Sequence, residues 1–229
     1  LFNLFRSLAS LPPVTSAPDL DPPAQRCALL LASHGAVTHD IPSTAPCWSE
    51  DAAAVVKDAL IANGDAVRAM DAYMKDADNP TTLGHRRWVL SNAIDGIGIG
   101  STTSSSCVHL GDGTASGGRD WVAWPPEGAV PLDLVRAHGL DETGWSVHAR
   151  FDLAGAEVKI EDTTTSADKP VAVTPLVTNY GSSHAVRVVP QGWTTEPGHA
   201  YRVTVTGAAQ PIDYRADVVD CRETIARAR

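Results

Sequence analysis

The spacing of apolar residues divides the chain into a helical first part and a strand-rich second part. Up to about residue 90, apolar residues recur every three or four positions, as on one face of a helix. From about residue 145 onward, short stretches alternate apolar and polar residues, and Gly, Pro, Asn and Ser separate them. This second pattern is typical of short strands at the spacing of a β-sandwich.

Start and stop signals delimit four helices in the first part. In the first of them, Leu1, Leu4, Phe5 and Leu8 share one face. Ser49 is a typical N-cap for the third, because acidic residues follow it in the first turn. A further short helix is predicted to start near Gly84, after a turn. The four predicted helices cover residues 1–9, 21–35, 49–64 and 65–76.

Strands are predicted at residues 97–101, 106–110 and 119–124, followed by a proline-rich exit at 124–131. Six further strand patterns lie in the second part, in the sequences WSVHARFDL, AEVKIED, KPVAVTPLV, AVRVVP, HAYRVTVTG and IDYRADVVD. The alternation around Gly98 and Gly100 lacks the continuation of a dinucleotide-binding loop. These glycines are expected to permit close packing against the strand that carries them.

Composition and charge narrow the classes of function. The 229 residues are 43% hydrophobic, so the chain can bury a sizeable core. The net charge of −9 argues against nucleic acid as a partner, because phosphate binding needs clustered Lys and Arg. No apolar stretch is long enough to predict a transmembrane helix. The chain starts without Met, and we expect a mature form with its leader removed.

Four cysteines are spread widely over the chain, at Cys27, Cys47, Cys107 and Cys221. Their even number and the lack of a CxxC pair favour disulfides in an oxidising compartment, although four buried thiols would also fit. Four cysteines allow three pairings. The preferred one joins Cys27 to Cys47 by proximity and Cys107 to Cys221 by elimination.

Four segments, taken in order, resemble bacterial members of the CAP superfamily of cysteine-rich secretory, antigen 5 and pathogenesis-related proteins. They are LFNLFRSLASLPPV, ALLLASHG, VTHD and GHRRWVLSNAIDGIGIGS. The resemblance covers residues 1–127 and implies an α–β–α sandwich, together with secretion or display at the cell surface. Residues 128–229 resemble the Ig-like or fibronectin-like β-sandwich modules often joined to such domains. The expected fold class is therefore α+β, with two domains.

The resemblance also implies a cleft that holds two histidines and two acidic residues. The histidines fall on His39 and His85. The acidic positions fall near Asp58 and Asp76, and the chain departs from the family at the first of these, where VKDALI has neither Glu nor Asn. Two neutral imidazoles can bind zinc, but a firm site needs a third protein ligand. Some members of the family hold a divalent metal in this cleft, so the resemblance implies His39 and His85 as candidate zinc ligands. No cofactor is required.

The two arginines that follow His85 are expected to be structural. One of them, Arg86 or Arg87, should pair with a carboxylate or cap carbonyl groups, and the other should point to solvent.

Two hypotheses of function follow from these patterns. The first is a secreted or cell-surface binding protein that holds a small ligand, a lipid or a peptide in the histidine cleft and performs no chemistry. The alternative is a metal-dependent hydrolase of the peptidase type, in which His39 and His85 bind the metal and Asp58 or Asp76 is the base. No motif names a nucleophile or a poised base, which favours the first hypothesis. A purely structural surface module is a third interpretation.

Overall fold

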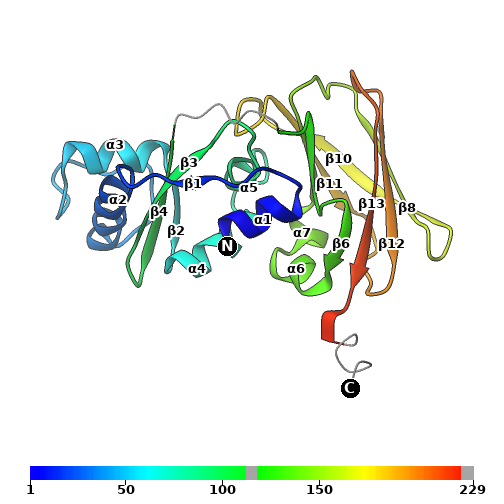
Figure 1. Ribbon diagram of the computed structural model, residues 1–229, viewed down its shortest axis with the longest axis horizontal. Helices are drawn as coiled ribbons and strands as arrows, with labels where there is room; N and C mark the ends of the chain where they lie inside the picture. Colours follow the sequence, from blue (N-terminus) through cyan, green and yellow to red (C-terminus); the bar gives the residue numbers. More distant parts are fainter. Residues whose placement is uncertain (112–117, 223–229) are drawn as a thin grey trace. The chain divides into compact units, whose positions relative to one another are not determined.

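A computed structural model describes residues 1–111 and 118–222 as a mixture of helices and several sheets, which confirms the predicted α+β class (Figure 1). The chain forms two compact units that alternate along the sequence. The first contains Leu1–Ser7, Leu11–Met74 and Ser91–Gly118, and the second contains Leu8–Ser10, Lys75–Leu90 and the chain from Arg119 on. The domain limit near residue 127 stays a prediction.

The first unit is built around a four-stranded sheet in the order β1-β3-β4-β2. Strand β1 is parallel to β3, and the other pairs are antiparallel. Its helices are α1 (Phe2–Leu8), α2 (Asp21–His34), α3 (Glu50–Asp58) and α4 (Ala66–Lys75). Its strands are β1 (Thr15–Ser16), β2 (Leu60–Asn63), β3 (Gly96–Ser101) and β4 (Ser105–Leu110).

Helix α2 packs closely on β3 because two glycines leave room for it. A Cβ on Gly98 would lie 2.3 Å from the backbone of Leu20, and one on Gly100 would lie 2.0 Å from the carbonyl oxygen of Ala24. No side chain fits at either position without moving the helix. The predicted role of these glycines in close packing is confirmed.

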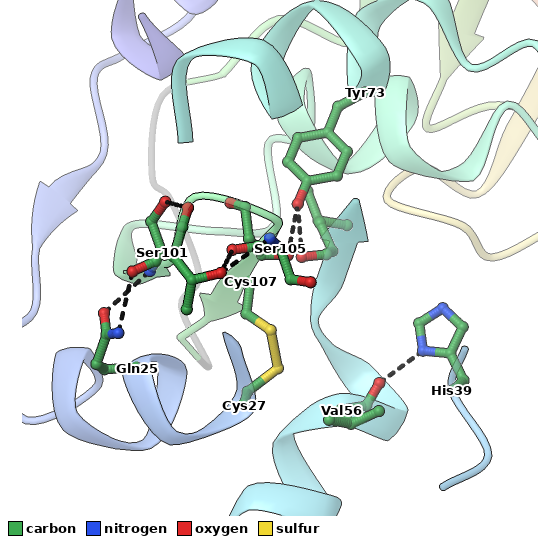
Figure 2. Close-up of a disulfide and its surroundings, with 11 residues drawn as sticks. Gln25, Cys27, His39, Val56, Tyr73, Ser101, Ser105 and Cys107 are labelled. Carbon is green, nitrogen blue, oxygen red and sulfur yellow. Dashed lines mark hydrogen bonds between the residues drawn. A yellow bond between two sulfur atoms is a disulfide. The ribbon is translucent and has the colours of Figure 1, made fainter. Parts of the chain in front are cut away.

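The disulfide of the first unit joins Cys27 of α2 to Cys107 of β4, so both predicted pairings are wrong (Figure 2). Cys107 lies opposite Gly100 in the sheet register and therefore faces the helix. Cys27 is fully buried on the inward side of α2, whereas Cys47 and Cys221 are exposed free thiols. Helix orientation decided the pairing, because α2 turns Cys27 into the core beside Cys107, whereas Cys47 is exposed.

The predicted apolar face of the first helix is confirmed for Phe5 and wrong for Leu1 and Leu4, and Leu8 is half-buried. Leu1 and Leu4 are exposed, whereas Phe2 and Phe5 are buried. The helix instead turns the guanidinium of Arg6 inward, where it donates hydrogen bonds to the carbonyl oxygens of Pro12 (2.9 Å) and Ser91 (2.6 Å). A buried charge of this kind is stable only when it is hydrogen-bonded, so these acceptors decide which face points inward.

The third predicted helix is shorter than expected. Helix α3 starts after Ser49, whose hydroxyl accepts a hydrogen bond from the backbone N–H of Ala52 (3.3 Å), as predicted. It ends at Asp58, and Leu60–Asn63 forms β2, which pairs with β4. Pairing with a neighbouring strand overrides the helical pattern of these residues.

The second unit has two sheets, in the orders β10-β11-β7-β5 and β6-β13-β12-β8-β9. Its helices are α5 (Gly84–Val89), α6 (Leu132–Ala137) and α7 (Leu140–Thr143). Its strands are β5 (Trp121–Trp124), β6 (Gly128–Pro131), β7 (Trp145–Ala149), β8 (Glu157–Asp162), β9 (Ala167–Lys169), β10 (Val171–Pro175), β11 (His184–Pro190), β12 (Ala200–Thr206) and β13 (Ile212–Val219).

Aromatic side chains from the two sheets contact one another. The ring of Trp145 in β7 lies edge-on to Tyr201 in β12, with centroids 5.7 Å apart. Trp121 in β5 lies 5.6 Å from Tyr214 in β13. Residues of the two sheets therefore share a core, and such aromatic pairs contribute beyond the area that they bury. The six strand patterns of the second part each contain strand, whereas α6 and α7 were not predicted.

Candidate functional site

Two of the predicted site residues, Asp76 and His85, form a close pair in the second unit. Nδ1 of His85 lies 2.9 Å from Oδ1 of Asp76. The same oxygen accepts a hydrogen bond from the side-chain amide of Asn79 (2.7 Å), and Oδ2 accepts one from the backbone N–H of Arg86 (3.2 Å). The Asp76 side chain is 0% exposed and that of His85 is 22% exposed. The site is thus a part-exposed imidazole held by a buried carboxylate.

The carboxylate sets the tautomer of His85. A carboxylate oxygen only accepts hydrogen bonds, so the ring nitrogen beside it carries the proton. In the neutral ring, Nε2 then carries the lone pair. The amide nitrogen of Asn79 lies 3.2 Å from Nδ1 and converges on the same oxygen of Asp76.

A tight turn brings this pair together. Helix α4 ends at Lys75, and the chain reverses before α5 begins at Gly84. The backbone N–H of Asn79 bonds to the carbonyl of Asp76 (3.2 Å), and that of Leu83 bonds to the carbonyl of Asn79 (2.7 Å). The predicted turn and short helix are confirmed, and together they place His85 on the first turn of α5, against Asp76.

The side chain of Arg86 is buried and donates hydrogen bonds in four directions. Nη1 donates to the carbonyl oxygen of Gly144 (2.8 Å) and to the hydroxyl of Ser146 (3.4 Å). Nη2 donates to the carbonyl oxygen of Lys75 (3.0 Å) and to the hydroxyl of Thr143 (3.0 Å). The guanidinium therefore connects the end of α4 with the segment between α7 and β7.

Arg87 is equally buried and binds a different segment. It donates to the carbonyl oxygen of Val177 (2.6 Å), to the carbonyl oxygen (2.9 Å) and hydroxyl (3.1 Å) of Ser182, and to the carbonyl oxygen of Thr82 (3.0 Å). Three of these four bonds reach the loop between β10 and β11. Both arginines thus connect helix α5 to the β-stranded part of the second unit.

The expectation that one of these arginines would point to solvent is wrong. Burial lowers the pKa of both Arg86 and Arg87 to about 10, and for Arg86 the charge of Asp76 opposes this shift. Both groups remain cations at neutral pH. A planar group with five donors can bind several carbonyl oxygens at once, which explains why neither arginine needs solvent.

His39 lies in the first unit, in the loop between α2 and α3. Its Nδ1 donates a hydrogen bond to the backbone carbonyl of Val56 in α3, at 2.6 Å (Figure 2). His39 is exposed, and so is Asp58, the last residue of α3. The two predicted histidines therefore share one feature, since Nδ1 is the hydrogen-bonded donor in each ring. His39 belongs to the first compact unit and His85 to the second.

A metal centre would need a third ligand beside the histidines. Within residues 1–111 and 118–222, no group of three or more His, Cys, Asp and Glu side chains is placed to hold a metal ion. Asp76, the predicted acidic partner of His85, already accepts three hydrogen bonds.

A buried histidine that the sequence analysis did not single out lies near the two arginines. Nε2 of His148 in β7 lies 3.0 Å from the hydroxyl of Ser146, and its Nδ1 has no hydrogen-bond partner among the described residues. Burial, and then the charges of Arg87 and Arg86, hold the pKa of His148 well below its usual 6.5. The alternation of WSVHA puts Ser146 and His148 on one face of the strand, and this signal could have identified them.

A second Asp–His pair, Asp162–His199, resembles the first in geometry. Nδ1 of His199 lies 2.8 Å from Oδ2 of Asp162, whose side chain is 0% exposed. Burial raises the pKa of Asp162, but hydrogen bonds from His199, Thr165, Lys169 and Thr164 outweigh that effect and lower it to about 2. These partners join β8, β9 and β12, so this pair has a structural role and is a natural control for Asp76–His85.

Residues 1–110 match the family model of the CAP (cysteine-rich secretory protein) family. The match supports membership of the CAP superfamily for this part of the chain, and it includes both histidines, both acidic positions and the two arginines. It ends with Leu110, the last residue of β4. No curated protein and no solved structure gives a significant match. None of the helices in the described part of the chain has the length and apolar character to span a membrane.

Proposed function

We propose that the protein is a secreted or cell-surface binding protein of the CAP superfamily, whose ligand site includes His85 and performs no chemistry. The observation that carries this proposal is the Asp76–His85 pair, with 2.9 Å between Oδ1 and Nδ1. The carboxylate fixes the ring orientation and tautomer of His85, as the protein oxygens beside metal-binding histidines do. His85, unlike His199 of the similar Asp162–His199 pair, also lies within the residues that match the family model.

The donor pattern limits the ligand. In His85 and His39 alike, Nδ1 is the donor to a protein oxygen, so Nε2 is the nitrogen that accepts. The ligand is accordingly a molecule with a hydrogen-bond donor, such as a small polar compound, a lipid headgroup or a peptide, or else a divalent cation.

Secretion is proposed on the buried Cys27–Cys107 disulfide together with the family match. The motif order is that of bacterial relatives. The two sheets with a shared aromatic core support an Ig-like or fibronectin-like sandwich for residues 128–229. An α–β–α sandwich for residues 1–127 is proposed on the packing of α2 against β3 and β4.

The alternative, a metal-dependent hydrolase, has one favourable observation. Metal-binding histidines usually donate their second ring nitrogen to a protein oxygen, as His39 and His85 do. Against it, a general base must reach a substrate proton, and Asp76 is fully buried with both oxygens engaged. Asp58 is exposed. The geometry therefore favours binding over hydrolysis.

The test follows the histidine ring signals by NMR while zinc chloride, palmitate or a mixture of random tetrapeptides is added. We expect at least one of these probes to shift the His85 signals, and the His85→Ala variant to bind it about tenfold or more weakly, a loss of about 1.4 kcal/mol. His199→Ala is the matched control and should bind as the wild type does. If no probe moves the His85 signals, or if the tetrapeptides are cleaved by wild type and not by His85→Ala, the proposal is wrong.

A further inference from the structure

The backbone is strained at both ends of the turn that precedes helix α5 and His85. Asp76 has φ +50° and Leu83 has φ +44°, and neither is a glycine. Such conformations are unfavourable for residues other than glycine and persist only where surrounding structure fixes them. The contacts of these two residues therefore show what holds the His85 site in place.

Asp76 is held through Arg86. The backbone N–H of Arg86 donates to Oδ2 of Asp76, while its guanidinium donates to the carbonyl of Lys75, the residue just before. The same guanidinium is bound from the other side by the hydroxyl of Thr143 and the carbonyl of Gly144. Thr143 and Gly144 are thus connected through the guanidinium to Lys75, the neighbour of Asp76, while the backbone of the same arginine binds the Asp76 carboxylate.

Leu83 is held by apolar packing from the same part of the chain. It is fully buried, and it forms a small core cluster with Leu176 and Ala185. The neighbouring Arg87 is hydrogen-bonded to the loop between β10 and β11, and within that loop a Cβ on Gly181 would lie 2.5 Å from the Arg87 carbonyl oxygen. The loop packs tightly on α5, so Leu83 has little room to leave its strained conformation.

We infer that the β-stranded part, from Trp121 to Val219, is the positioning element of the His85 imidazole. It holds Asp76 through Thr143, Gly144 and Arg86, and it holds Leu83 through Leu176 and Ala185. Asp76 and Leu83 lie at the two ends of the turn, and their fixed backbone conformations bring the side chains of Asp76 and His85 together. The strands that follow the family-matched residues thus supply the contacts that hold Asp76 and His85 in place. A change at Thr143 or Gly144 should therefore change the orientation of the His85 ring.

The inference rests on the proposed function in taking His85 as the group that contacts the ligand. Its test reads the imidazole itself and needs no ligand, so the two proposals fail separately. The ¹⁵N shifts of the two ring nitrogens distinguish a ring protonated at Nδ1 from one that exchanges between tautomers. The Asp76→Ala variant removes both carboxylate oxygens and gives the reference signal of a released ring.

The variants are the near-isosteric pair Thr143→Val and Thr143→Ser in the full chain. Valine removes the hydroxyl that accepts from Arg86, and serine restores it. We expect the two His85 ring nitrogens in Thr143→Val to move toward an averaged shift, as in Asp76→Ala, and Thr143→Ser to restore the wild-type shifts. The His199 signals should stay constant in all of them, because a loss of stability alone does not select one ring.

Wild-type His85 shifts in a folded Thr143→Val variant would overturn the inference. If Thr143→Val does not fold, the milder Ser182→Ala variant carries the test. It removes one acceptor of Arg87 and leaves the carbonyl contacts in place. A movement of the His85 shifts in that variant, with constant His199 shifts, supports the inference, and unchanged His85 shifts overturn it.

Discussion

The backbone N–H of Arg86 donates a hydrogen bond to Oδ2 of Asp76, and His85 donates to the other oxygen of the same carboxylate. Two consecutive residues of one helix therefore bind one buried aspartate. The charge of this aspartate also partly compensates the buried guanidinium of Arg86. Asp76 is thus important for stability as well as for the orientation of the ring.

Replacing Asp76 by Asn should destabilise the protein by about 3 kcal/mol, because it leaves a buried cation without its countercharge. Asn tolerates positive φ as well as Asp does, so the strained backbone adds nothing to this difference. Denaturant unfolding measures the change. The control Asp58→Asn lies at an exposed position, and we expect an effect within about 0.5 kcal/mol. Equal effects of the two substitutions would contradict the role given to Asp76.

Replacing Arg86 by Lys should lower the free energy of unfolding by about 2 kcal/mol or more. An ammonium cannot reach Gly144, Thr143 and Lys75 together, and buried acceptors that lose their donor carry a desolvation penalty. Arg68→Lys is the control, because the side chain of Arg68 is 80% exposed. Denaturant unfolding of both variants measures the difference. An unchanged midpoint for Arg86→Lys would show that the hydrogen bonds of the Arg86 guanidinium contribute nothing to stability.

Thiol counting on denatured, unreduced protein should find two free thiols, those of Cys47 and Cys221. The Cys27–Cys107 bond closes a span of 80 residues, for which loop entropy predicts a stabilisation of about 4 kcal/mol. The double variant Cys27→Ala, Cys107→Ala should lose about that amount. Cys47→Ser should unfold at the wild-type denaturant concentration. Four free thiols would mean that the bond does not form.

Stability should fall as the pH drops below about 6.5, and His148 is one cause. Its pKa in the folded protein is held well below the value of the unfolded chain. Between these two values the unfolded chain binds the extra proton, so unfolding becomes easier as pH falls, by up to about 1.4 kcal/mol per pH unit. Above pH 6.5 this contribution no longer varies. Between pH 7.5 and 5.0, the free energy of unfolding should therefore fall less steeply with falling pH in His148→Phe than in the wild type. Parallel curves for the two proteins would exclude His148 as the cause.

Local pattern predicted most of the elements. Helix α2 and its stop at Gly35, the turn before Gly84 and the strand patterns of the second part depend on neighbours in the sequence, so they could be read directly. The failures occurred where a distant partner decides. Leu60–Asn63 became a strand because β4 lies beside it, and the face of α1 follows from the acceptors of Arg6.

The site was predicted in the same uneven way. The motif order pointed to His39, His85 and Asp76, and the structure brings Asp76 and His85 together. The number of cysteines favoured disulfides, but the direction in which α2 turns Cys27 selected Cys107 as its partner. Spacing along the chain carries no information about which face of a helix meets which strand.

The sequence by itself determined the α+β composition, the family resemblance of the first part and the identity of the residues that matter near His85. Only the tertiary structure decided what Arg86 and Arg87 do. A guanidinium can be buried when carbonyl and hydroxyl oxygens surround it. Apart from the carbonyls of Lys75 and Thr82, those oxygens come from residues 57 to 95 positions further along the chain. Hydrogen bonds over that separation exist only after the β-stranded part has folded against α5.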